Sequence, residues 1–252
     1  MNKNEIMVGV KDHYNYLKEL YPENQILGVF LYGSQNYGTD TNLSDIDTKA
    51  ILIPSFQELC LEKPVSKSFI IPTGEQCEVK DIREMVYNFR KQNMNFLEIL
   101  YTEYKILNPK YEYLWNEFFV SNREKIARYD TKKAVTSAAG QAKHTLLQNP
   151  EDGKKLSNAF RMYLAIENYI ENKSYAECIY LPQDTRENLK QLKIDKTKAL
   201  VPRVDFLVDY FTTCLYYPET KVKVTSEKQK QEIDKFMNDG IIALLRKNVY
   251  EI

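Results

Sequence analysis

The chain has 252 residues, 43% of them hydrophobic, and its 35 basic residues balance its 35 acidic residues. This length allows one large or two small domains with a buried core, and zero net charge argues against indiscriminate nucleic-acid binding. The four cysteines are scattered, which indicates neither a zinc site nor a disulfide framework. No apolar run reaches the roughly 20 residues of a membrane helix, and the N-terminus lacks the apolar region of a signal peptide. We therefore expect a cytoplasmic protein with no membrane partner.

The N-terminal part of the chain alternates between helical and strand patterns. Hydrophobic periodicity and turn residues predict, in order, a helix, two strands and a hairpin over residues 4–20, Ile26–Tyr32, Ala50–Ile53 and 69–79. From residue 81 the apolar period becomes helical, and no further strand is expected.

The remainder of the chain has the pattern of consecutive helices separated by prolines. These helices are expected over approximately 110–128, 131–148, 154–173, 184–193, 203–216 and 226–247. The sequence thus predicts an α/β (α+β) protein. A small mixed β-sheet catalytic core with helices over residues 1–108 would precede an all-helical substrate-binding region over residues 109–252.

Two aspartates stand at the start of the second predicted strand. The strand carries them in the segment Ser44-Asp45-Ile46-Asp47, and nine residues separate this segment from the pair Gly33-Ser34. Because side chains alternate along a strand, Asp45 and Asp47 would share one face, roughly 6.5–7 Å apart. Carboxylates at that separation can converge on two divalent cations about 3.5–4 Å apart. This pattern predicts a site for Mg²⁺ or Mn²⁺ and chemistry at phosphoryl oxygens.

The glycine-serine pair predicts a phosphate site beside these acids. Gly33 lacks a Cβ, so the backbone can approach a bulky anion, and Ser34 adds a hydroxyl and an N–H at the start of a short helical turn. Ser44 is grouped with them as a nucleotide-binding residue that caps or orients Asp45. Either Tyr32 or Tyr37, which flank the turn, could stack on a base.

This arrangement resembles the signature of the DNA polymerase β-like nucleotidyltransferase superfamily, in which Gly-Ser is followed, after a variable gap, by Asp-hydrophobic-Asp. The resemblance implies that a nucleoside triphosphate binds at Gly33-Ser34. It also implies that Asp45 and Asp47 are catalytic metal ligands, with a third carboxylate supplied by a neighbouring strand.

The third carboxylate is assigned to Glu78, which lies in the second strand of the predicted hairpin. Val79 would then face the core while Glu78 faces the metal ions. Glu75 and Asp81 are the alternatives, although Asp81 fits better as the N-cap of the helix that follows.

Roughly residues 20–200 also resemble a bacterial and phage group of predicted nucleotidyltransferases described as RNA-repair-pathway polymerase β-like proteins. In that group Asn-Pro precedes an apolar-Glu-apolar-Leu stretch, and this chain has Met94 in the proline position of Asn93–Leu100. Weaker likenesses lie in the segments Gly140-Gln141, Lys154–Met162 and Leu181-Pro182. The group's name implies a reaction class more than a substrate.

Polar residues on two of the predicted helices are the candidates for substrate binding. Lys154, Asn158 and Arg161 share one helical face by their spacing and could bind phosphate or an RNA backbone; a solvated helix surface is the alternative. The residues assigned to substrate binding are Gln141, Lys155, Asn158 and Arg161.

The favoured function is transfer of a nucleoside monophosphate from an NTP to an acceptor hydroxyl with release of pyrophosphate. The resemblance favours a tRNA or other RNA end as acceptor. The charge distribution agrees, because residues 1–126 hold 14 basic and 18 acidic residues whereas 127–252 hold 21 and 17. The alternatives are nucleotidylation of a small molecule or a protein, and a nucleotide-binding module without turnover.

Overall fold

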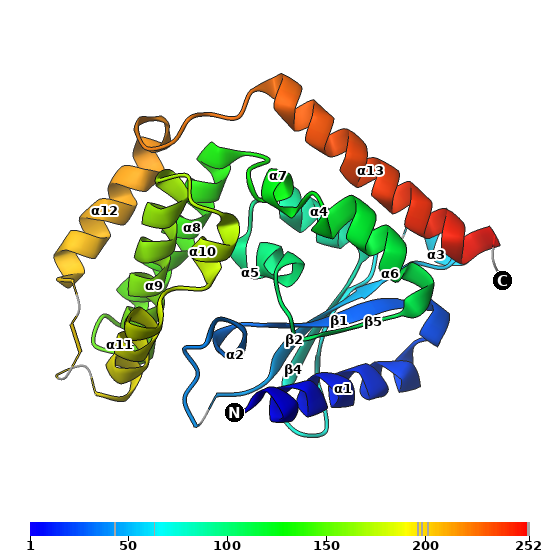
Figure 1. The fold of residues 1–252 in the computed structure, drawn as a ribbon, viewed down its shortest axis with the longest axis horizontal. Helices are drawn as coiled ribbons and strands as arrows, with labels where there is room; N and C mark the ends of the chain where they lie inside the picture. The colour runs from blue at the N-terminus through cyan, green and yellow to red at the C-terminus, as the bar shows by residue number, and fades with distance from the viewer. Residues whose placement is uncertain (43, 63, 196, 198, 201, 251–252) are drawn as a thin grey trace.

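A mixed β-sheet forms the centre of the N-terminal part of the protein (Figure 1). The computed structural model describes residues 1–42, 44–62, 64–195, 197, 199–200 and 202–250. Within this described part, five strands pair in the order β3-β4-β2-β1-β5, with β2 and β4 parallel and the other neighbours antiparallel. Their bounds are β1 (Ile26–Tyr32), β2 (Asp47–Leu52), β3 (Ser66–Ile70), β4 (Gln76–Asp81) and β5 (Lys105–Leu107). The predicted fold class is confirmed.

Strand β5 corrects the expectation that no strand follows residue 81. Its three residues pair with β1 at the edge of the sheet, where Ile106 lies opposite Val29. A segment this short has too few residues for an alternating pattern, so only its pairing with β1 identifies it as a strand.

Helices cover both faces of the sheet. Helix α1 (Lys3–Leu20) packs on one face, where Val10 and Leu17 join Val29 and Ala50 in a buried cluster. Helix α4 (Ile82–Arg90) and the helical segments over residues 94–115 cover the other face (Figure 1). Ile51 belongs to that second cluster. Lys49 and Asp47 lie two and four residues before it on β2, so their side chains are on the same face of the sheet and point toward the helical region.

Most of the predicted helices are present, but residues 110–128 do not form one continuous helix. Helix α6 (Pro109–Trp115) runs into a π-helical segment, Asn116–Val120, and α7 (Arg123–Ala127) follows after a turn. The wider π turn accompanies stacking of the buried Trp115 and Phe119 rings, whose centroids are 4.9 Å apart. The remaining helices are α2 (Ser34–Tyr37), α3 (Phe56–Cys60), α5 (Met94–Leu97), α8 (Thr131–Gln148), α9 (Gly153–Ile170), α10 (Tyr175–Ile179), α11 (Gln183–Ile194), α12 (Val204–Tyr216) and α13 (Glu227–Tyr250).

The last helix returns to the N-terminal part of the chain. Along α13, Asp234 accepts a hydrogen bond from Arg90 Nε at 2.6 Å, and Asn248 Nδ2 donates to the carbonyl of Pro54 at 3.3 Å. One buried hydrophobic cluster includes both Phe30 of β1 and Leu244 of α13. The division of the chain at residues 108 and 109 stays a prediction.

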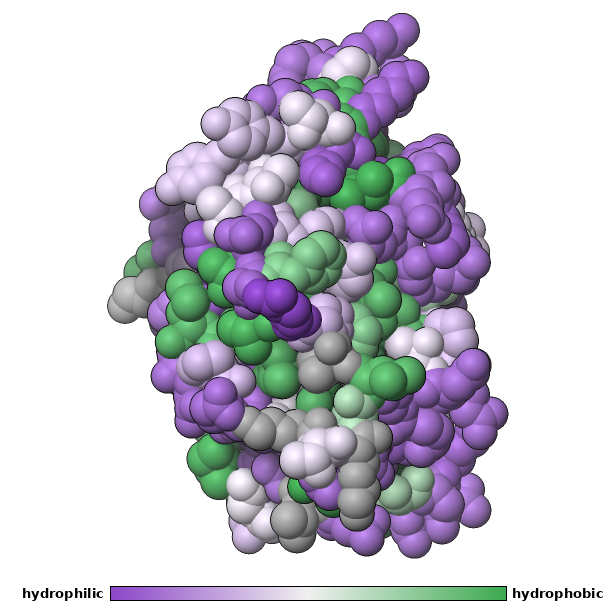
Figure 2. All heavy atoms as spheres, turned by 90° about the vertical axis from the view of Figure 1, so that its left-hand side faces the viewer, coloured by the Kyte–Doolittle hydropathy of each residue, from purple (hydrophilic) through white to green (hydrophobic). Residues whose placement is uncertain are grey.

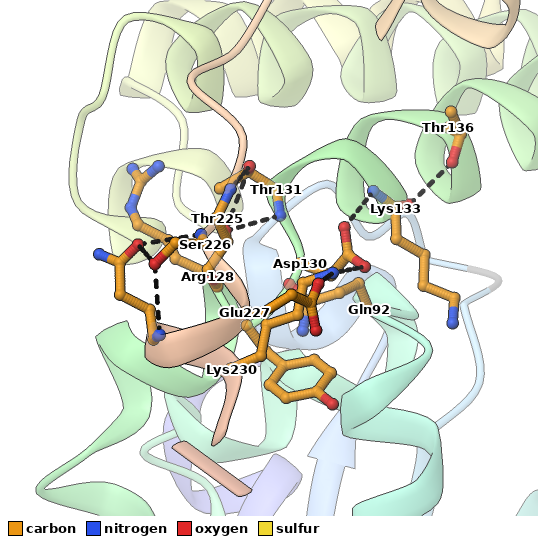
Figure 3. Close-up of polar contacts among 12 residues, drawn as sticks. Gln92, Arg128, Asp130, Thr131, Lys133, Thr136, Thr225, Ser226, Glu227 and Lys230 are labelled. Atoms are coloured by element: carbon orange, nitrogen blue, oxygen red, sulfur yellow. Dashed lines mark hydrogen bonds and ion pairs between the residues drawn. The ribbon is translucent and has the colours of Figure 1, made fainter. Parts of the chain in front are cut away.

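Hydrogen bonds fix the segment that leads into α13 against the start of α8 (Figure 3). Thr131 and Thr225 each donate a backbone N–H to the other's hydroxyl at 3.2 Å. Beside them, Lys230 is ion-paired with Asp130 at 2.9 Å. This contact borders an open, largely apolar cavity of about 740 Å³, whose walls include Tyr169 and Phe236.

Figure 2 shows the face of the molecule on the side of α12 in Figure 1, where hydrophobic side chains gather amid hydrophilic ones. Helices α9 and α12 meet through the rings of Tyr163, Phe206 and Tyr210. The ring centroids of Tyr163 and Tyr210 lie 4.7 Å apart. Among the helices that the structure describes, none is both long enough and apolar enough to cross a bilayer.

Candidate functional site

The predicted phosphate turn joins the end of β1 to α2. Gly33 has φ +82° and ψ −158°, a backbone conformation that is essentially restricted to glycine. A Cβ built on Gly33 would lie 3.7 Å from Oδ2 of Asp47. The glycine turn and the second aspartate are therefore neighbours, because β1 and β2 pair with Tyr32 opposite Asp47.

The two aspartates lie at and just before the start of β2, and their arrangement on one face of the strand stays a prediction. Asp47 begins β2, whereas Asp45 is exposed in the extended segment just before it. Between them, Ile46 points to the opposite layer and packs at Gly9 of α1, whose missing Cβ leaves the space it fills. Burial raises the pKa of Asp47 and the neighbouring charge of Asp45 raises it further, while the cations of Lys49 and Lys154 oppose both effects.

Glu78 lies on the predicted face of the sheet but is already paired with cations. In the parallel register of β2 and β4 it stands opposite Lys49. Its carboxylate is 2.5 Å from the ammonium of Lys49 and 3.2 Å from that of Lys80. Burial opposes ionisation of Glu78, but the two lysines outweigh it and hold the pKa of Glu78 below its ordinary value.

The donor set fits a divalent cation only in part. Asp45 and Asp47 offer two neighbouring carboxylates, the hard oxygen ligands that Mg²⁺ and Mn²⁺ take. Across the described residues, however, no group of three or more His, Cys, Asp or Glu side chains is arranged to hold a metal ion. Glu78 would have to leave its lysine partners to join the aspartates, and its role as third metal ligand stays a prediction.

The two alternative carboxylates have other partners. Asp81 is the N-cap of α4, as its position predicts, and accepts the backbone N–H of Arg83 at 2.9 Å. Glu75 lies on the α1 side, where it accepts the N–H of Ile46 at 3.3 Å and contacts His13. Glu75 therefore supports the backbone between the two aspartates from the opposite side of the sheet.

Lys49 is a site residue that the sequence analysis overlooked. Only 2% of its surface is exposed, and its ammonium lies 3.8 Å from the ring centroid of Tyr32 and 4.1 Å from that of Phe96. Burial lowers the pKa of Lys49, and the carboxylate of Glu78 opposes that effect. The sequence could have indicated Lys49, because its spacing of two residues from Asp47 and four from Asp45 puts it on the same face of a strand. The ring of Tyr32, one of the two that could stack on a base, covers this lysine, and stacking on a base stays a prediction.

Glu98 is the second overlooked residue. It begins a 3₁₀ turn, Glu98–Leu100, after α5 and is 3% exposed. Its Oε1 accepts the backbone N–H of Gly33 at 2.7 Å. Burial raises the pKa of Glu98 to about 7, although the charge of Arg161, the Gly33 N–H and the charge of Lys49 act in the other direction. The resemblance drew attention to Asn93–Leu100 but gave this glutamate no role.

A cavity of about 150 Å³ opens beside the glycine turn. Three of the four residues assigned to substrate binding line it together with Gly33, namely Gln141, Asn158 and Arg161. Lys155 is directed elsewhere, since its ammonium donates to Gln148 on α8 at 3.2 Å.

Arg161 is the strongest polar feature of this cavity. It is 7% exposed, its Nε has no hydrogen-bond partner, and its guanidinium lies 4.0 Å from the ring centroid of Tyr37. A buried cation with an unused donor is costly unless a ligand or a nearby charge compensates it. Tyr37, the other ring expected to stack on a base, packs on this guanidinium.

Ser44 shapes the loop that returns to the aspartates. Its hydroxyl accepts the N–H of Thr41 at 2.9 Å, and its carbonyl accepts a hydrogen bond from Gln35 at 3.1 Å. The role of Ser44 in binding a nucleotide stays a prediction.

Comparison with known proteins does not add to this geometry. No protein-family model matches the sequence, and no curated protein matches it. The superfamily likeness therefore rests on Gly33-Ser34, Asp45 and Asp47 themselves, and the assignment of function rests on the site.

Proposed function

We propose that this protein is a metal-dependent nucleotidyltransferase that moves a nucleoside monophosphate from an NTP to an acceptor hydroxyl. One observation carries the proposal. A Cβ built on Gly33 would lie 3.7 Å from Asp47 Oδ2, and the same glycine lines a cavity that contains the buried Arg161. The turn is thus adjacent both to a carboxylate that can hold a metal ion and to a cation that can bind phosphate.

In this proposal each group of the site has one task. Asp45 and Asp47 would hold Mg²⁺ or Mn²⁺, which when bound supplies positive charge to phosphoryl oxygens. The Gly33-Ser34 turn binds the triphosphate, whose negative charge Arg161 and Lys154 compensate. The acceptor hydroxyl releases its proton to water as its oxygen attacks the α-phosphorus in line, and the bond from the α-phosphorus to the bridging oxygen breaks as pyrophosphate leaves.

An RNA end is the acceptor we favour. Lys154 is exposed at the start of α9, and its charge acts on Asp47 inside the site. A cation in that position can bind the backbone phosphate of an incoming strand. The small volume of the cavity, about 150 Å³, supports the second candidate, a small-molecule acceptor that enters completely.

Labelled nucleotides test the proposal. The purified protein is incubated with Mg²⁺ or Mn²⁺, each α-labelled NTP in turn, and bulk cellular RNA. The Asp45→Ala/Asp47→Ala variant is compared with a matched control, Asp12→Ala/Asp205→Ala, which removes two exposed aspartates outside the site. We expect ribonuclease-sensitive label with the wild type and the control only.

Each other outcome has a defined meaning. Label on protein or on small molecules, and not on RNA, would favour the second candidate over an RNA acceptor. Bound nucleotide without any transfer would favour a binding module. Undiminished transfer by the Asp45→Ala/Asp47→Ala variant would refute the assignment of the site.

A further inference from the structure

The backbone N–H of Gly33 points inward, to a buried carboxylate. Glu98 accepts it at 2.7 Å from a 3₁₀ turn that is 65 residues further along the chain. The glutamate is 3% exposed, so this contact lies behind the turn. Gly33 therefore does not offer its N–H to the cleft in this structure.

The conformation of Gly33 makes such a restraint useful. With φ +82° and ψ −158° the residue lies in a region that glycine alone visits readily, and glycine is also the residue with the most alternative conformations. A hydrogen bond from the Gly33 N–H to a fixed, buried acceptor selects one of them. In that conformation the turn stands beside both Asp47 and the cavity of Arg161.

Two cations act on Glu98 against the effect of its burial. Burial disfavours the ionised form and raises the pKa of Glu98 to about 7, while the guanidinium of Arg161 and the ammonium of Lys49 favour ionisation. Lys49 lies on β2 and Arg161 on α9, so the carboxylate stands between the sheet and the helical region. This arrangement gives the residue a fixed position independent of any ligand.

We propose that Glu98 is a positioning residue that holds the Gly33 turn in the conformation that binds a triphosphate. This inference rests on the proposed function. Glu98 acts through Gly33 and does not itself contact the substrate. The requirement is for an acceptor oxygen at the end of a side chain of this length, so glutamine satisfies it and leucine or aspartate does not.

Binding of inorganic tripolyphosphate in the presence of Mg²⁺, measured by calorimetry, tests the proposal without any contribution from a base or an acceptor. Leaving the backbone N–H of Gly33 without its acceptor corresponds to roughly a 5- to 150-fold loss in affinity. We expect Glu98→Leu and Glu98→Asp to weaken binding at least about 5-fold, and Glu98→Gln to stay within about 3-fold of the wild type.

A matched control separates positioning from general damage. Glu124 also accepts a backbone N–H, that of Tyr175 at 3.0 Å, but lies outside the site. Glu124→Leu should leave tripolyphosphate binding unchanged. Circular dichroism establishes that each variant is folded, and Glu98→Asp keeps the test decisive if the leucine variant does not fold.

The two proposals fail in different ways. If the wild type does not bind tripolyphosphate, the proposed function is overturned, and the inference about Glu98 with it. If the wild type binds it and Glu98→Asp binds it equally well, the role of Glu98 is overturned while the proposed function stands. Loss of binding in Glu98→Gln equal to that in Glu98→Leu also overturns the inference, because rescue by an acceptor oxygen is its defining result.

Discussion

The buried pair of Lys49 and Glu78 provides a test of what Glu78 does. Lys49 is 2% exposed, whereas the side chain of Glu78 is 24% exposed and has Lys80 as a second partner at 3.2 Å. Substitution of Glu78 by glutamine leaves an unpaired ammonium inside the protein. Substitution of Lys49 by methionine leaves a carboxylate that is still paired and still reaches solvent.

This asymmetry sets the expected magnitudes. Removing one partner of a buried ion pair costs about 3–5 kcal/mol, and the partial exposure of the Glu78 side chain puts Glu78→Gln at about 3 kcal/mol. Lys49→Met retains the stem that packs between the rings of Tyr32 and Phe96, and we expect it to cost about 1 kcal/mol. The double variant Lys49→Met/Glu78→Gln should cost less than Glu78→Gln alone, because no buried charge is then left unpaired.

Urea unfolding followed by circular dichroism measures these differences, with the free energy of unfolding obtained by linear extrapolation. If Glu78→Gln falls within about 1 kcal/mol of the wild type, or if Lys49→Met costs more than Glu78→Gln, the reasoning is refuted. Transfer lost in Glu78→Gln with unchanged stability would instead support Glu78 as the third metal ligand.

Three further predictions concern single residues. Gly33→Ala should cost about 1–3 kcal/mol of stability by strain at positive φ and also weaken tripolyphosphate binding, whereas Gly74→Ala, at φ +92° in the hairpin turn, should lose stability and keep binding. Burial raises the pKa of Glu98 from 4.5 to about 7, so the folded chain holds this proton more tightly than the unfolded chain. The free energy of unfolding should therefore fall by about 3 kcal/mol between pH 4.5 and 7. Urea titrations at several pH values should show a smaller fall for Glu98→Gln. Thr225→Val removes the hydroxyl that accepts the N–H of Thr131 at 3.2 Å and should lower the free energy of unfolding by about 1–3 kcal/mol, whereas the exposed Thr213→Val should change it little in the same urea assay.

Local pattern predicted much of the fold. The helix that became α1, the strands β1 and β2, and the β3–β4 hairpin follow from hydrophobic period and turn residues. Two features were missed for different reasons. Strand β5 exists through its pairing with the distant strand β1, whereas the π turn after α6 accompanies a local contact, the stacking of Trp115 on Phe119 four residues later.

The site was predicted best where its residues are close in sequence. Asp45 and Asp47 were found by strand alternation and Gly33 by the conformational freedom of glycine. Glu98 could not be found in this way, since its contact with Gly33 joins residues 65 positions apart. The pairing of Glu78 with Lys49 depends on the register of β2 with β4, which no periodicity specifies.

The α/β class, the helical C-terminal part and the two acids near a glycine-serine turn could all be inferred from the sequence, because period, turn chemistry and alternation are local properties of a few neighbouring residues. Tertiary packing was needed to show that Glu78 is paired with lysines, that Arg161 is buried beside Tyr37, and that Glu98 accepts the N–H of Gly33. Those contacts depend on strand register and on how α9 packs against the sheet region, and both are set by the burial of side chains distant in the chain.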